Sequence, residues 1–147
     1  MRENRPDQRA GVEMRSYYEF FAGGGMVRAG LGNEWTCAFA NDIDLKKGDS
    51  YRANWGSDHL KIGDVAKLTT ADLPGRAALA WASFPCQDLS LAGNGAGLEG
   101  RRSGTFWPFW HLVQELRAEG RAPSLVVLEN ASHDSSSTYC TVAAETG

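Results

Sequence analysis

Short apolar segments alternate with longer amphipathic segments along the chain. Strand-like segments, which are short and apolar or aromatic, lie at residues 16–21, 35–40, 59–62, 79–83 and 124–128. Helical patterns cover residues 26–31, 45–55 and 105–119, with a single helical turn at residues 69–73. Asp44 is the expected N-cap of the helix at 45–55, and Gly120 fits the end of the helix at 105–119.

This order of segments predicts an α/β fold with a doubly wound, mainly parallel, Rossmann-like sheet. After the strand at 124–128, residues 131–147 are rich in Ser and Thr and have no periodicity. We therefore expect the sheet to be truncated after about the fifth strand, with a disordered tail that a truncation or frameshift would explain. Residues 1–14 are interpreted as a flexible lead, which leaves residues 15–130 as one domain.

Composition and charge give no sign of several classes of protein. The 147 residues carry a net charge of −3, so the chain as a whole has no basic signature of nucleic-acid binding. No apolar run is long enough to span a membrane and residues 1–14 do not resemble a signal peptide, so a cytoplasmic location is expected. The three cysteines form neither a disulfide framework nor a zinc pattern, and the three histidines predict no metal site.

A glycine run between the first strand and the first helix indicates a nucleoside-containing cofactor. Gly23, Gly24 and Gly25 let a ligand approach the backbone, and Asp42 follows about 20 residues later, where an acid can bind a ribose. Arg28 replaces the third glycine of the dinucleotide fingerprint, which favours an adenosyl cofactor over a nicotinamide. Asp64 ends the third strand and can face the adenine, although a solvated turn aspartate is the more common interpretation by itself.

A cysteine directly after the fourth strand is the candidate nucleophile. Cys86 lies in the tetrapeptide Phe84-Pro85-Cys86-Gln87, at a strand end where open sheets place ligands. Its alternative role is that of a small buried apolar residue. Glu129 follows the fifth strand and could lie beside Cys86, a pairing that suits thiol addition to a heterocycle, or it could cap a loop. Arg102, in the loop after Cys86, could contact phosphate or carry solvated surface charge.

Together these residues resemble the C5-cytosine DNA methyltransferase family, whose fold is a Rossmann-like methyltransferase sheet. The resemblance covers about residues 16–130. Phe21-Ala22-Gly23-Gly24-Gly25 is similar to the first cofactor motif, and Phe84-Pro85-Cys86-Gln87 is similar to the catalytic loop. Leu128-Glu129-Asn130 matches the start of the Glu-Asn-Val motif.

The resemblance implies S-adenosylmethionine as cofactor and double-stranded DNA with a flipped cytosine as substrate. It implies catalysis by Cys86, which would attack C6, and Glu129, which would contact N3. The implied cofactor site comprises Phe21, Ala22, Gly23, Gly24, Gly25, Asp42, Ile43, Asp64, Val65, Pro85 and Phe106. The implied DNA contacts are Gln87, Ser90 and Arg102.

The chain departs from the family pattern after Asn130. The family's arginine pair, its target recognition domain and its last cofactor motif are not found in residues 131–147, so weak or absent activity is expected of this chain alone. Two alternatives stay open: a non-catalytic, degenerate cofactor-binding module, and an RNA-directed relative that methylates tRNA. The oligomeric state and the recognition sequence are left open.

Overall fold

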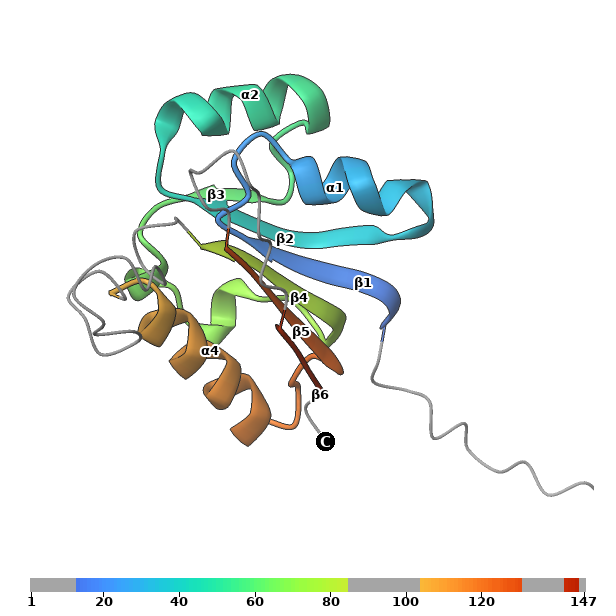
Figure 1. Cartoon of the computed structure of the whole chain (residues 1–147), viewed down its shortest axis with the longest axis vertical. Helices are drawn as coiled ribbons and strands as arrows, with labels where there is room; N and C mark the ends of the chain where they lie inside the picture. The colour runs from blue at the N-terminus through green and yellow to red at the C-terminus, as the bar shows by residue number, and fades with distance from the viewer. Residues whose placement is uncertain (1–12, 85–103, 131–141, 146–147) are drawn as a thin grey trace, which may run out of the picture.

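The computed structural model of the protein describes residues 13–84, 104–130 and 142–145. In these residues six strands form one sheet in the order β3-β2-β1-β4-β5-β6 (Figure 1). The strands are β1 (Glu13–Phe20), β2 (Thr36–Asp42), β3 (Leu60–Ile62), β4 (Ala77–Phe84), β5 (Leu125–Asn130) and β6 (Val142–Glu145). The first five strands are parallel, which confirms the predicted doubly wound α/β fold.

The described helices follow the predicted segments closely. They are α1 (Met26–Leu31), α2 (Leu45–Trp55) and α4 (Phe106–Ala118), with 3-10 turns η1 (Gly32–Glu34), η2 (Val65–Lys67) and η3 (Thr70–Asp72). Asp44 is the N-cap of α2, because its side chain accepts hydrogen bonds from the backbone N–H groups of Lys46 and Lys47 at 2.8 and 3.1 Å. Local signals in the sequence therefore determine where α2 begins.

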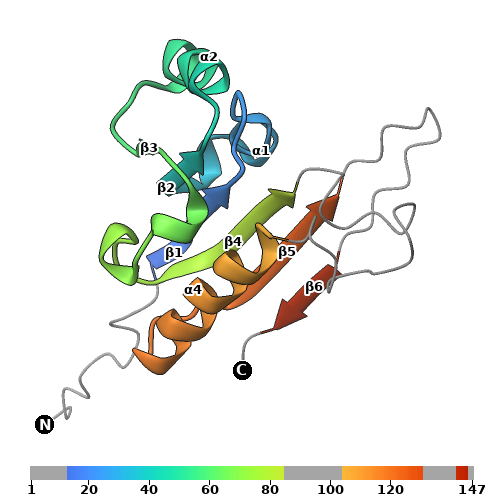
Figure 2. The ribbon, with the colours of Figure 1, turned by 90° about the vertical axis from the view of Figure 1, so that its left-hand side faces the viewer.

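The helices cover opposite faces of the sheet. Helices α1 and α2 lie on one face, and α4 lies on the other with the turns between β3 and β4 (Figures 1 and 2). Side chains alternate between the faces along each strand, so that Tyr17 and Tyr18 belong to different apolar clusters. Because helices cover both faces (Figure 2), strand side chains are buried on both sides of the sheet.

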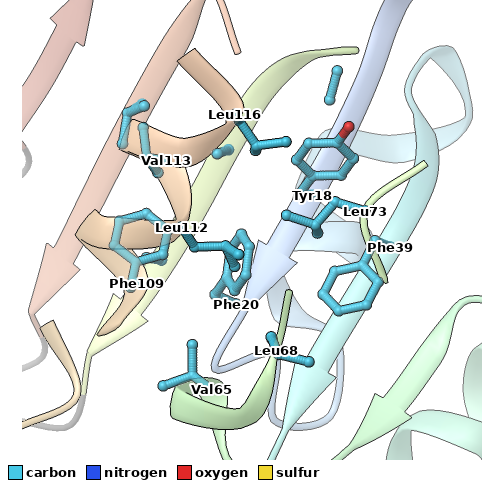
Figure 3. Packing of buried hydrophobic residues seen from close by; sticks show 14 of the residues in the cluster. Tyr18, Phe20, Phe39, Val65, Leu68, Leu73, Phe109, Leu112, Val113 and Leu116 are labelled. Atoms are coloured by element: carbon cyan, nitrogen blue, oxygen red, sulfur yellow. The ribbon is translucent and has the colours of Figure 1, made fainter. Parts of the chain in front are cut away.

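The larger cluster lies under α4. Phe20 packs there with Phe109 and Phe39, whose ring centroids lie 4.9 and 5.8 Å, respectively, from that of Phe20 (Figure 3). The predicted apolar face of α4 supplies Phe106, Phe109, Leu112, Val113 and Leu116, all of them buried. Tyr18 keeps its hydroxyl satisfied by donating to the carbonyl oxygen of Pro74 at 2.7 Å. Helix α4 thus packs against side chains of β1 and β2 as well as against those of β4 and β5, the two strands that it connects.

The tail differs from expectation at four residues. Val142–Glu145 form β6, which pairs antiparallel with β5 from Leu125↔Glu145 to Leu128↔Val142. An unpaired strand edge exposes N–H and C=O groups that a short extended segment can satisfy, and β6 does so here. The rest of the tail, and residues 1–12 of the expected lead, lie outside the described residues.

Candidate functional site

The carboxyl ends of the five parallel strands meet at one edge of the sheet. Phe20 at the end of β1 pairs with Asn41 of β2 and with Ala82 of β4. Further along the sheet, Phe84 at the end of β4 pairs with Asn130 at the end of β5. The described ends of these strands therefore lie side by side, at the edge where ligands bind in open α/β sheets.

The glycine turn between β1 and α1 is fixed by a close contact with α2. Gly25 has φ 86°, and a Cβ at this position would lie 2.2 Å from the indole Nε1 of Trp55. That indole nitrogen donates a hydrogen bond to the carbonyl oxygen of Gly24 at 3.1 Å. Gly23 also has a positive φ, of 55°, but faces open space. Only glycine fits position 25, and the turn leaves room above Gly23.

Asp42 joins the glycine turn to the end of β2. Its Oδ2 accepts a hydrogen bond from the backbone N–H of Gly23 at 2.8 Å, and its Oδ1 accepts one from the N–H of Asp44 at 2.8 Å. The side chain is buried. The next residue, Ile43, is 67% exposed although it is large and apolar. The predicted ribose-binding acid thus also fixes the backbone, and it is followed by an apolar side chain open to a ligand.

The end of β3 is joined to this edge through Asn41. Its side-chain Nδ2 donates to the carbonyl oxygens of Lys61 and Gly63 at 2.9 and 3.0 Å. Asp64, the predicted adenine contact, accepts from the N–H of Ala66 at 2.9 Å and so caps η2. Val65 was also predicted at the cofactor site, but its side chain is buried in the cluster under α4. Any contact from Val65 would therefore come from its backbone.

Three aromatic side chains lie together where the β1–β3 part of this edge meets the β4–β5 part. The ring of Phe84 lies 4.8 Å from that of Phe21 and 5.6 Å from that of Phe106, centroid to centroid. Phe21 is half-buried and has φ 57°, which is unusual for a residue other than glycine. The structure thus brings the predicted residues Phe21 and Phe106 together, with Phe106 mostly inside the core.

Glu19 is a buried acid that sequence reasoning missed. It is 0% exposed on β1, and neither carboxyl oxygen has a hydrogen-bond partner among the described residues. Burial raises the pKa of Glu19 to about 7; the backbone N–H groups of Val27 and Arg28, which lie outside hydrogen-bond geometry, and the Arg28 charge offset part of that rise. A charged residue among the aromatic residues of a strand, just before a glycine run, was the available signal.

Arg28 has a packing role that explains its place in the motif. Its guanidinium lies 5.3 Å from the ring centroid of Trp55 and donates to the hydroxyl of Tyr51 at 3.1 Å, so it links α1 to α2. Arg28 also lines a hollow of about 400 Å³ with Trp35 and Cys37, beside the amino end of β2. This hollow lies at the opposite end of β2 from the glycine turn.

Glu129 lies on β5 within reach of two donors from β4. The indole Nε1 of Trp81 and the hydroxyl of Ser83 both donate hydrogen bonds to Oε2 of Glu129, each at 3.0 Å. The carboxyl group is therefore held at the end of β5 beside the end of β4. The predicted neighbour Cys86 lies outside the described residues, as do Pro85, Gln87, Ser90 and Arg102.

Neither a metal-binding cluster nor a membrane-spanning helix is found in the described part of the chain. No group of three or more His, Cys, Asp or Glu side chains is arranged there to hold a metal ion. Likewise, no helix within residues 13–84 and 104–130 is long and apolar enough to cross a membrane.

The fold is that of methyltransferases. The structure resembles the Dnmt2 methyltransferase of S. pombe, with a TM-score of 0.57 and 19% identity over 80% of this chain and 34% of that chain. It resembles the methyltransferase EhMeth of Entamoeba histolytica with a TM-score of 0.59 and 17% identity over 79% of this chain and 38% of that one. At these identities the likeness concerns the fold alone.

The sequence comparisons establish the family. The family model of the C-5 cytosine-specific DNA methylases matches residues 16–138, and the chain belongs to this family. It is 32% identical to the type II methyltransferase M.NgoBI of Neisseria gonorrhoeae and 30% identical to M.HpaII of Haemophilus parainfluenzae. These matches cover 82% and 95% of this chain but 37% and 38% of the two relatives. The chain thus spans little more than a third of their length.

Proposed function

We propose that this chain binds S-adenosylmethionine and carries the nucleophile of a DNA (cytosine-5-)-methyltransferase. The observation that carries the proposal is the meeting of two features at one sheet edge. One is a glycine turn fixed by Asp42, and the other is Glu129 at the end of β5, beside the strand that leads to Cys86. Family membership gives these features their chemical meaning.

The residues of the first half fit the cofactor. The space above Gly23 suits the close approach of a ligand, and the carboxylate oxygens of Asp42 retain lone pairs for ribose hydroxyls. Ile43 is exposed where an adenine could pack, and Asp64 can accept from its amine. Glu19, a buried acid without a partner in the described residues, is complementary to a cationic group. When bound, S-adenosylmethionine would supply an electrophilic methyl group to C5 of the base.

The residues of the second half fit the base. The Cys86 thiolate would add to C6 of a flipped cytosine, while Glu129 in its protonated form would donate a hydrogen bond to N3 and stabilise the negative charge that moves into the ring. After C5 is methylated, loss of the C5 proton and departure of the Cys86 sulfur from C6 would restore the aromatic ring. Cys86 follows the end of β4 by two residues in the sequence.

Transfer of tritiated methyl groups tests this function. Purified chain is mixed with labelled S-adenosylmethionine and either duplex DNA or tRNA, and we expect weak incorporation into DNA that Cys86→Ala abolishes. Cys37→Ser is the matched control, because it alters a buried thiol on the amino half of β2. Incorporation that survives Cys86→Ala would contradict the mechanism, acceptance by tRNA alone would overturn the DNA assignment, and no incorporation would refute catalysis by this chain.

A further inference from the structure

Two residues of β4 converge on one oxygen of the proposed catalytic acid. Ser83 pairs directly with Glu129 across the parallel strands, and Trp81 lies two residues earlier on the same face of β4. Both donate to Oε2 of Glu129 at 3.0 Å, and neither donates to Oε1. Such convergence depends on the register of β4 and β5, which therefore determines how the acid is presented.

We propose that Trp81 and Ser83 are positioning residues that fix Oε2 of Glu129 and reserve Oε1 for the target base. The proposal rests on the proposed function, because Glu129 acts on a base only if the chain is a cytosine methyltransferase. It adds two residues to those that the family motifs indicate, and it assigns different roles to the two oxygens of the acid.

The hydrogen-bond count supports this division of roles. A carboxyl oxygen accepts two hydrogen bonds in the plane of the group, and the two donors fill both positions on Oε2. A proton on Oε2 would break the bond from the Trp81 indole or force the Ser83 hydroxyl to turn and accept, whereas a proton on Oε1 would leave both donors in place. Hydrogen bonding with N3 of a cytosine is therefore directed to Oε1.

The same contacts restrict the motion of the acid. A glutamate side chain rotates about three bonds, and two donors from a neighbouring strand select one orientation before any substrate arrives. Trp81 is half-buried and packs against the apolar cluster that includes Leu79 and Val127, so its indole is itself held by packing. An acid that is oriented in advance loses less freedom when the base binds.

Nuclear magnetic resonance of the tryptophan indole groups tests the hold on Oε2 without requiring activity. The chain has five tryptophans, and the Trp81 indole signal is assigned by its disappearance in Trp81→Phe. We expect this signal to stay in the hydrogen-bonded range in Glu129→Gln, whose amide oxygen can take the place of Oε2, and to leave that range in Glu129→Ala, which removes the acceptor. A Trp81 signal at the same position in Glu129→Ala and in the unmutated chain would overturn the proposal.

Methyl transfer then tests the positioning role. We expect Trp81→Phe and Ser83→Ala to lower kcat roughly 10- to 100-fold with little change in KM for S-adenosylmethionine, and Ser83→Thr to restore most of the rate. Thermal unfolding shows that each variant folds. Unchanged kcat in Trp81→Phe and Ser83→Ala would refute the proposal while leaving the function intact. Loss of transfer in the unmutated chain would refute the function instead, and the indole signal would still decide whether Trp81 holds Oε2 of Glu129.

Discussion

The two halves of the sheet edge hold their acids in different ways. On the β1–β3 side, Asp42 binds backbone N–H groups, and the glycine turn is pressed against Trp55. On the β4–β5 side, Glu129 is held by the side chains of Trp81 and Ser83. Backbone contacts follow from a local motif, whereas side-chain contacts depend on strand register. The position of Asp42 is thus fixed by the backbone, whereas the position of the Glu129 carboxyl group can be changed by replacing a single side chain.

The largest expected effect is a loss of stability when the contact between the glycine turn and Trp55 is disrupted. Gly25→Ala would place a Cβ 2.2 Å from Trp55 Nε1 at a positive φ, and we expect it to lower the free energy of unfolding by about 3–4 kcal/mol. Urea denaturation measures this change.

Gly30→Ala is the matched control, because a Cβ there meets nothing within 4 Å inside α1. It should leave stability unchanged or raise it by up to about 1 kcal/mol. Equal losses in the two variants would show that the contact with Trp55 does not fix the turn.

The next largest effect is a pH-dependent change in stability caused by Glu19. The pKa rises from 4.5 in the unfolded chain to about 7 in the folded one, so between these values the unfolded chain releases its proton first. The contribution of Glu19 to stability is therefore complete below pH 4.5 and is lost as the pH rises to 7, a change of roughly 3 kcal/mol. Glu19→Gln should remove this dependence and be more stable than the unmutated chain at pH 8.

Urea denaturation between pH 4 and 8 measures the difference between the two proteins. Glu34→Gln, on an exposed side chain paired with Arg15 at 3.4 Å, should follow the unmutated chain throughout. A constant difference between Glu19→Gln and the unmutated chain across this range would contradict the assigned pKa.

Removal of the Asp42 carboxylate should have an intermediate effect. Asp42→Ala leaves the N–H groups of Gly23 and Asp44 without their acceptor, which should cost about 2 kcal/mol of stability. Asp49→Ala removes an exposed carboxylate paired only with Arg52 among the described residues, and should cost under about 0.5 kcal/mol. A similar loss in both variants would argue against the backbone role of Asp42.

The smallest expected effect lies in the second half. Ser83→Ala removes one of two donors to Glu129, and the other remains, so stability should fall by no more than about 1 kcal/mol. The expected loss is therefore smaller than that in Asp42→Ala. A loss above about 2 kcal/mol would show that the second half is as integral to the fold as the first.

Helices and strands could be predicted from the sequence where nearby residues determine their bounds. The bounds of α1 and α2 follow from the glycine turn and from the Asp44 cap, and both matched. The strands β1 and β4 are longer than predicted, because pairing with neighbours extends them beyond their apolar centres. The β6 strand was missed since its only visible cause is the free edge of β5.

The candidate site divides in the same way. Gly23, Gly25 and Asp42 could be recognised because their spacing along the chain reflects one turn and one strand. The contacts of Trp81 and Ser83 with Glu129 could not, because strand register joins residues that are 48 and 46 positions apart in the sequence, respectively. Glu19 was missed because an acidic residue in a strand does not by itself reveal that its side chain is buried without a partner among the described residues.

Calorimetric titration with S-adenosylhomocysteine tests the central claim, that this edge is a formed cofactor site, most directly. Ile43 and Leu45 are both 67% exposed, but only Ile43 belongs to the predicted site, so Ile43→Ser and Leu45→Ser form a matched pair. We expect the unmutated chain and Leu45→Ser to bind with equal affinity and Ile43→Ser to bind about tenfold more weakly. A folded chain that releases no heat of binding, or equal loss of affinity in both variants, would contradict the account.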